Sequence, residues 1–124
     1  MATTILLVDD HPLFRKGLRL LLEEEADFRI VGEAGDGREA IDRVRKHSPD
    51  VVIMDITMPD FNGVEATRKI VAEDSSAKVV ALSMHSGKSF VEGMLKAGAA
   101  GYILKKSVPE DLVEAVRMVV QGDI

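Results

Sequence analysis

Five short runs of apolar and β-branched residues recur along the chain, and a stretch with helical spacing follows each of them. The apolar runs occupy residues 4–9, 29–34, 50–55, 78–83 and 101–105. The first helical stretch begins at Pro12 and closes at the charged run 23–25, and the others cover roughly 37–47, 63–73, 88–97 and 109–121. Strands that are buried on both faces need no polar alternation. The pattern therefore predicts a parallel sheet with helices on both sides.

Chain length limits this architecture to one domain. Five strand–helix units in 124 residues fit a flavodoxin-like, doubly wound α/β sheet with five strands in the order 2-1-3-4-5 and five helices. Cysteine is absent, so a disulfide, a thiol nucleophile and a thiolate metal site are excluded. The longest apolar runs, at about five residues, are far shorter than the roughly 20 that cross a bilayer, and the N-terminus does not resemble a signal peptide. We expect a cytoplasmic protein with no membrane segment.

The formal net charge of −5 limits the choice of partner. Proteins that bind nucleic acid carry clustered basic residues, which displace counterions from phosphates. This chain is therefore not expected to contact DNA itself. An acidic surplus suits a bound cation or a basic partner better.

Polar residues gather where the predicted strands end. Asp9 and Asp10 follow the first strand, and Asp55, Ser83 and Lys105 stand at the ends of the third, fourth and fifth. Because the strands at the centre of such a sheet lie about 4.8 Å apart, these side chains should converge on one cleft. Three carboxylates against one ammonium leave excess negative charge, which Mg²⁺ with its oxygen ligands would neutralise.

Asp55 has the surroundings of a nucleophile. It precedes a turn that contains Pro59 and Gly63, so its carboxylate should be presented at the mouth of a loop. A carboxylate beside Mg²⁺, a lysine and a hydroxyl is equipped to attack a phosphoryl group. Lys105 would then pair with the transferred group, and Ser83 would donate a hydrogen bond to it.

Taken together, the residues at the strand ends, with Pro59, Gly63 and Tyr102, resemble the receiver domain of a two-component response regulator. The stretches LSMHS and AGAAGYILKK are similar to the NarL/LuxR type of regulator. The resemblance implies a signalling domain, with only self-phosphorylation and self-dephosphorylation activity, that a sensor histidine kinase phosphorylates. It further implies control of transcription, with DNA bound by a helix-turn-helix domain that this chain does not contain. We expect residues 1–124 to be the receiver domain, as a fragment rather than a stand-alone protein.

The resemblance also implies roles for individual residues. Asp55 would be the phosphoacceptor, and Asp10, Asp55 and the carbonyl of Thr57 would hold Mg²⁺. Asp9 would support the ion through water. Ser83 and Tyr102 would form the switch pair, in which the hydroxyl moves to the phosphoryl group and the aromatic ring turns inward behind it.

Two further expectations concern the rate of dephosphorylation and self-association. Thr57 and His85 stand two residues beyond the acceptor and the switch serine, where they would flank an attacking water and set the rate of dephosphorylation. The first and last helices carry apolar residues off their core stripes, namely Leu13, Leu20, Val113 and Val120. A homodimer through these two helices is therefore a hypothesis.

Two other functions fit the sequence less well. A phosphatase of the haloacid-dehalogenase type needs a second acid two residues after its nucleophile, and this chain has Thr57 there. A flavodoxin-like electron carrier needs a hydroxyl- and glycine-rich loop after the first strand, where the sequence has DDHP. His11 and His85 lack the spacing of a zinc motif and are interpreted as solvated loop histidines.

Overall fold

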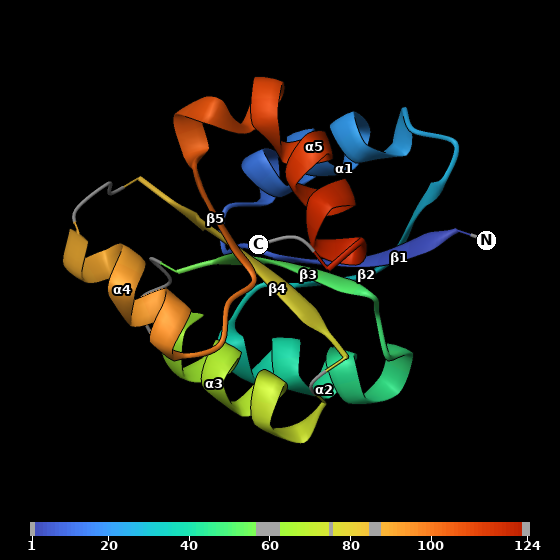
Figure 1. Cartoon of the computed structure of the whole chain (residues 1–124). Coiled ribbons are helices and arrows are strands. Elements are labelled where there is room, and N and C mark those ends of the chain that lie inside the picture. The colour runs from blue at the N-terminus through green and yellow to red at the C-terminus, as the bar shows by residue number, and fades with distance from the viewer. Residues whose placement is uncertain (1, 57–62, 75, 85–87, 123–124) are drawn as a thin grey trace.

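Five parallel strands form one sheet whose two faces are covered by helices (Figure 1). The computed structural model of the chain describes residues 2–56, 63–74, 76–84 and 88–122. The strands are β1 (Thr3–Val8), β2 (Phe28–Ala34), β3 (Val51–Asp55), β4 (Lys78–Ser83) and β5 (Gly101–Leu104). The helices are α1 (Pro12–Glu23), α2 (Gly37–His47), α3 (Gly63–Glu73), α4 (Lys88–Lys96) and α5 (Val108–Val120), with a short 3-10 helix, η1 (Lys105–Ser107), before α5. The strand order is β2-β1-β3-β4-β5, which confirms the predicted fold class.

The continuous apolar runs are explained by two hydrophobic layers, one on each side of the sheet. In β3, Val51 and Ile53 face one layer while Val52 and Met54 face the other, and all four side chains are fully buried. Figure 1 shows α1 and α5 together on one face and α2, α3 and α4 on the opposite face. We call these the α1/α5 layer and the α2–α4 layer. None of the described helices is long and apolar enough to cross a membrane.

The end of β5 differs from the expected one. The apolar run predicts that the fifth strand ends at Lys105, but the strand ends at Leu104 and Lys105 opens the 3-10 helix. Leu104 is the register partner of Ser83, the last residue of β4, so no residue of β4 remains to pair with Lys105. The chain turns there because the sheet offers no further hydrogen-bonding partner.

The surface of the α1/α5 layer also needs one correction. Leu13 and Leu20 are 85% and 61% exposed and Val120 is 46% exposed, as expected for residues off the core stripe. Val113, in contrast, is half-buried and packs against the α1/α5 layer. It precedes the buried Val116 by three residues, and residues three apart lie on the same helix face.

Candidate functional site

The register of the sheet brings the predicted site residues to one edge. Val8 of β1 lies beside Met54 of β3, and Asp55 lies beside Leu82 of β4. The carboxyl ends of β1, β3, β4 and β5 therefore meet within about one residue of each other. This is the edge at which doubly wound sheets bind their ligands.

Two of the three aspartates are fully buried. Asp9 and Asp55 are both 0% exposed. Burial of its carboxyl, together with the nearby charge of Asp55, raises the pKa of Asp9, while the backbone N–H of His11 and the charge of Lys105 act in the opposite direction. A buried carboxylate is costly unless cations or donors surround it. Positive charge is therefore needed at this edge to compensate the two buried carboxylates.

Lys105 supplies part of this positive charge. Its Nζ donates a hydrogen bond to Asp55 Oδ2 at 3.2 Å and lies 3.4 Å from Asp9 Oδ2. The ammonium also sits 4.7 Å from the centre of the Phe14 ring, and the side chain is only 13% exposed. One ammonium is thus shared between two buried carboxylates, and the cluster stays negative.

Asp10 adds the third carboxylate at the rim of the edge. Its side chain is 28% exposed, yet its Oδ1 is buried and accepts no hydrogen bond from any part of the chain that the structure describes. Asp9 Oδ2 likewise lacks a hydrogen bond there. Carboxylate oxygens left without donors suit a hard divalent cation, so the residues at this edge fit Mg²⁺. Thr57, whose carbonyl was predicted to complete the site, lies outside the described residues.

His11 belongs to the same cluster, and sequence reasoning missed this. One ligand atom each from Asp9, Asp10, His11 and Asp55 lies within 4.8 Å of the others. The imidazole is 68% exposed, as expected of a solvated histidine, but its Nδ1 is 3.1 Å from Asp10 Oδ1. The available signal was proximity: a histidine directly after two site aspartates, in a short loop, cannot leave their neighbourhood.

The loop between β1 and α1 is held by charged side chains. The backbone N–H of His11 donates to Asp9 Oδ1 at 2.8 Å, and Arg15 Nη1 donates to the Asp9 carbonyl at 2.6 Å. Arg15 and Arg19 both contact the carboxylate of Glu33 on β2, at 2.7 and 2.6 Å. The aspartate pair is therefore fixed relative to the neighbouring strand.

Gly63 allows α3 to begin directly against the end of β3. A Cβ at this position would stand 2.6 Å from Ile56 Cα and 2.8 Å from the Asp55 carbonyl oxygen. Both are backbone atoms, so they cannot rotate away as a side chain does. The glycine lets the helix approach the backbone that carries the Asp55 carboxylate.

The two predicted switch residues occupy different positions. Ser83 is fully buried at the end of β4 and lines a small pocket of about 200 Å³ together with Met84, Leu104, Lys105 and Lys106. Tyr102 is half-buried, pairs with Ala81 and packs against the α2–α4 layer. The serine thus stands beside Lys105, whereas the tyrosine lies further back along β5. His85, predicted to tune dephosphorylation, lies outside the described residues.

Comparison with known proteins gives the family. The family model described as the response regulator receiver domain matches residues 5–117. The transcriptional regulatory protein DegU of Brevibacillus brevis is 46% identical over 118 residues, which cover 95% of this chain and 50% of DegU. The chain spans about half the length of the curated relatives it matches.

Solved structures agree. A two-component response regulator of the LuxR family from an Aurantimonas species matches with a TM-score of 0.95 and 41% identity, covering 99% of this chain and 88% of that one. The receiver domain of a NarL regulator from Mycobacterium tuberculosis, called putative, matches with a TM-score of 0.92 and 33% identity, covering 98% of both chains. The chain belongs to the receiver domain family of two-component response regulators. Within that family it is of the NarL/LuxR type.

Proposed function

We propose that this chain accepts a phosphoryl group on Asp55 from a sensor histidine kinase, with Mg²⁺ at the acidic edge of the sheet. One observation carries the proposal. The ammonium of Lys105 lies between the buried carboxylates of Asp55 and Asp9, with Asp10 beside them at the same strand ends. This is a place where a nucleophilic carboxylate and charge-neutralising groups converge.

The chemistry follows from these positions. A carboxylate oxygen of Asp55 forms the new bond to phosphorus while the bond from phosphorus to the donor's imidazole nitrogen breaks, and that nitrogen keeps the bonding electrons. Lys105 pairs with the negative charge on the transferred group, and the hydroxyl of Ser83 donates to it. Mg²⁺, when bound, would neutralise negative charge on the phosphoryl oxygens. Its protein ligands would be Asp10, Asp55 and the carbonyl of Thr57, with Asp9 acting through water.

Chemical phosphorylation tests the acceptor directly. Incubation with acetyl phosphate and Mg²⁺ should add one phosphoryl group, which hydroxylamine should remove because acyl phosphates are labile to it. Asp55→Asn should abolish the adduct in intact-mass spectra. Asp42→Asn is the matched control, because Asp42 is exposed on α2. A stoichiometric adduct that persists in Asp55→Asn would show that the acceptor is a different residue.

The lifetime of the adduct should depend on Thr57 and His85. Replacing both with alanine should change the rate of dephosphorylation several-fold and leave Mg²⁺ affinity unchanged. Equal decay of the two phosphorylated proteins would remove these residues from the mechanism.

Phosphorylation should act on the switch through Ser83 and Tyr102. We infer that the hydroxyl moves toward the phosphoryl group and the ring turns inward, which remodels the surface around α4 across residues 83–106. Beryllofluoride with Mg²⁺, a stable mimic, should therefore shift amide resonances throughout this segment. Shifts confined to the neighbours of Asp55 would contradict the switch.

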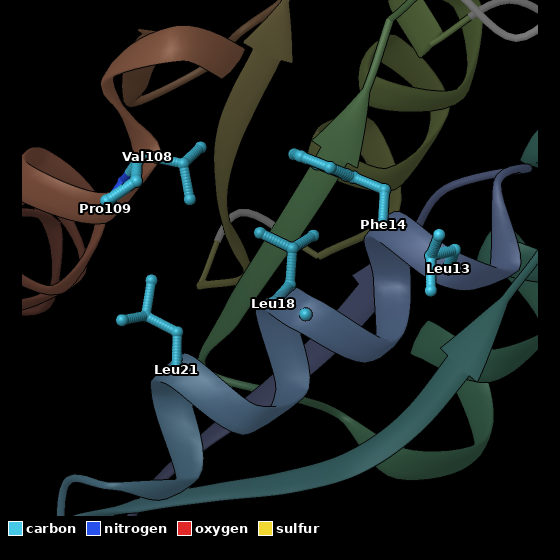
Figure 2. A pocket seen from close by; sticks show the side chains of 7 residues that line it. Leu13, Phe14, Leu18, Leu21, Val108 and Pro109 are labelled. Carbon is cyan, nitrogen blue, oxygen red and sulfur yellow. The ribbon is translucent and has the colours of Figure 1, made fainter.

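Self-association is the output that the surface supports best. An apolar groove of about 510 Å³ runs between α1 and the start of α5, and its lining comprises Leu13, Phe14, Gly17, Leu18, Leu21, Val108 and Pro109. Figure 2 shows Leu18 and Leu21 of α1 facing Val108 and Pro109 across this groove. We propose a homodimer through α1 and α5 that phosphorylation favours. Analytical ultracentrifugation should show that beryllofluoride increases self-association of the protein and that Leu13→Glu removes this increase. If the protein remains a monomer with beryllofluoride, the dimer proposal is refuted, while the proposal that Asp55 accepts the phosphoryl group stands.

The final output is proposed to be transcription. DegU carries the words "transcriptional regulatory protein" in its name, and this chain covers only half of it. We propose that residues 1–124 serve as the receiver of such a regulator, with DNA bound by a helix-turn-helix domain outside this chain. The full open reading frame tests this, because a frame without a DNA-binding domain would contradict it.

A further inference from the structure

The ammonium of Lys105 has two kinds of neighbour. Its Nζ lies 3.2 Å from Asp55 Oδ2 and 3.4 Å from Asp9 Oδ2, and it also lies 4.7 Å from the centre of the Phe14 ring. A lysine on a protein surface ordinarily extends its ammonium into water. The Lys105 side chain is only 13% exposed, so the carboxylates and the ring replace most of that water.

Phe14 is fixed relative to the acidic edge. It lies in the first turn of α1, and α1 begins just after the loop that follows Asp9. Its neighbour Arg15 donates a hydrogen bond from Nη1 to the Asp9 carbonyl at 2.6 Å, which ties this turn to the loop. The Phe14 side chain is half-buried and packs against the α1/α5 layer. Phe14 therefore presents a well-anchored aromatic face to Lys105.

Confinement of the ammonium matters for phosphoryl transfer. A lysine side chain is flexible, and ordering it at the moment of reaction costs conformational entropy. A cation over an aromatic face is attracted by the ring, and the attraction is largest where water is excluded. We propose that Phe14 is a positioning residue for phosphoryl transfer to Asp55, because its ring holds the ammonium of Lys105 at the acidic edge, where it pairs with the transferred group. The inference rests on the proposed function and concerns a residue that acts only through Lys105.

A space-filling role in the hydrophobic layer is the competing explanation for Phe14. The buried Leu18 follows it by four residues, so Phe14 also belongs to the apolar stripe of α1. In that role, its replacement would change stability but not the chemistry in which Lys105 takes part. Leucine keeps an apolar side chain without the ring, whereas tyrosine keeps the ring. Comparison of these two variants therefore separates the two roles.

The rate of phosphorylation by acetyl phosphate in saturating Mg²⁺ measures the effect on chemistry. Phe14→Leu should lower this rate about threefold to thirtyfold, the range expected for loss of a cation–π contact that is partly or fully desolvated. Phe14→Tyr should restore a rate close to that of the wild-type protein. Circular dichroism selects a temperature at which every variant is folded.

Phe28→Leu is the matched control. The centre of the Phe28 ring lies 4.9 Å from Arg117 Cζ, and the residue belongs to the same hydrophobic layer as Phe14. Phe28 is the first residue of β2, however, and stands away from the carboxyl ends of the strands. Its replacement should lower the stability of the protein and leave the rate of phosphorylation unchanged.

Side-chain NMR observes the contact between ring and lysine without phosphorylation. In protein with isotopically labelled lysines, the ring current of Phe14 should shift the ε-methylene protons of Lys105 upfield. That signal is assigned by its loss in Lys105→Met. Phe14→Leu should return the signal to the ordinary position of a lysine, and Phe14→Tyr should keep the shift.

Four results would overturn the proposal: equal phosphorylation rates in the wild-type protein and Phe14→Leu, an equal fall in Phe14→Leu and Phe14→Tyr, a comparable fall in Phe28→Leu, or a Lys105 signal without an upfield shift. All four leave Asp55 as the acceptor. Failure of the proposed function looks different, because the wild-type protein then forms no adduct or Asp55→Asn retains it, and the inference falls with it.

Discussion

Replacing Lys105 with methionine isolates the electrostatic balance of the acidic edge. The ammonium lies 3.2 Å from Asp55 Oδ2 and 3.4 Å from Asp9 Oδ2. At an effective dielectric constant of about 20, each of these contacts corresponds to a gross attraction of roughly 5 kcal/mol. Methionine keeps the apolar stem of the lysine beside Phe14, so the substitution removes charge and preserves most of the packing.

The net effect is smaller than the gross attraction, because the variant no longer has to desolvate an ammonium group. It does, however, leave Asp9 and Asp55 buried with no cation between them. Removal of one member of a buried ion pair costs about 3–5 kcal/mol. Because Lys105 retains some contact with solvent, we expect the lower end, a loss of about 3 kcal/mol in the free energy of unfolding without divalent ions.

Mg²⁺ should reverse much of this loss. In the variant the ion no longer competes with an ammonium, so it should bind more tightly than in the wild-type protein. Binding at a hundredfold excess over the dissociation constant stabilises a folded state by about 2.7 kcal/mol. The two proteins should therefore differ much less in saturating MgCl₂ than in its absence.

Urea unfolding followed by circular dichroism, with and without MgCl₂, measures both effects. Lys106→Met is the matched control, because Lys106 belongs to the same 3-10 helix and is exposed. A loss below about 1 kcal/mol for Lys105→Met would refute the reasoning, since the buried carboxylates would then not depend on the ammonium. A loss that MgCl₂ leaves unchanged would show that no divalent ion replaces it.

Substitutions at three further residues, one of them with a matched control, test individual groups. The pKa of Asp9 is raised above its ordinary value of 3.8, so its ionisation reduces stability as pH rises from that value through the folded-state pKa; Asp9→Asn should raise stability at neutral pH and flatten this fall in pH-dependent unfolding. Gly63→Ala should cost about 1–3 kcal/mol or more, because its Cβ would meet backbone, whereas Gly93→Ala in α4 meets nothing and should stabilise by several tenths of a kcal/mol. Thr67→Val should stabilise by about 1 kcal/mol, because the buried Oγ1 has no hydrogen-bond partner in the described structure. Thermal melts would contradict the last two if Gly63→Ala were neutral or Thr67→Val destabilising.

The fold could be predicted almost completely from the sequence because its signals are local. Two buried faces require uninterrupted apolar strands, and proline marks the first turns of both α1 and α5. The end of β5 could not be predicted, because it depends on where β4 stops, and that is a property of pairing between strands. The half-burial of Val113 could not be predicted for a similar reason, since it depends on how α5 packs onto its hydrophobic cluster.

The site also has features that the sequence predicts and features that it does not. Asp9, Asp10, Asp55 and Lys105 could be placed together because parallel strands end at one edge, which is a consequence of topology alone. That Asp9 is buried while Asp10 reaches the rim depends on the course of one loop. The orientation of the His11 ring depends on side-chain rotation, which sequence spacing does not encode.

The edge strand β5 contributes side chains to both hydrophobic layers. In the sheet that the structure describes, β5 pairs with β4, and Tyr102 packs against the α2–α4 layer while Ile103 is buried in the α1/α5 layer. Successive side chains of a strand point to opposite faces, so a small rotation or slide of this strand displaces both residues together. If the tyrosine moves on activation, we expect the change to reach the α1/α5 layer through β5, at the margin of the sheet, without a change in the central strands. A short strand with a single neighbour is well suited to act as a hinge between two otherwise separate halves of the core.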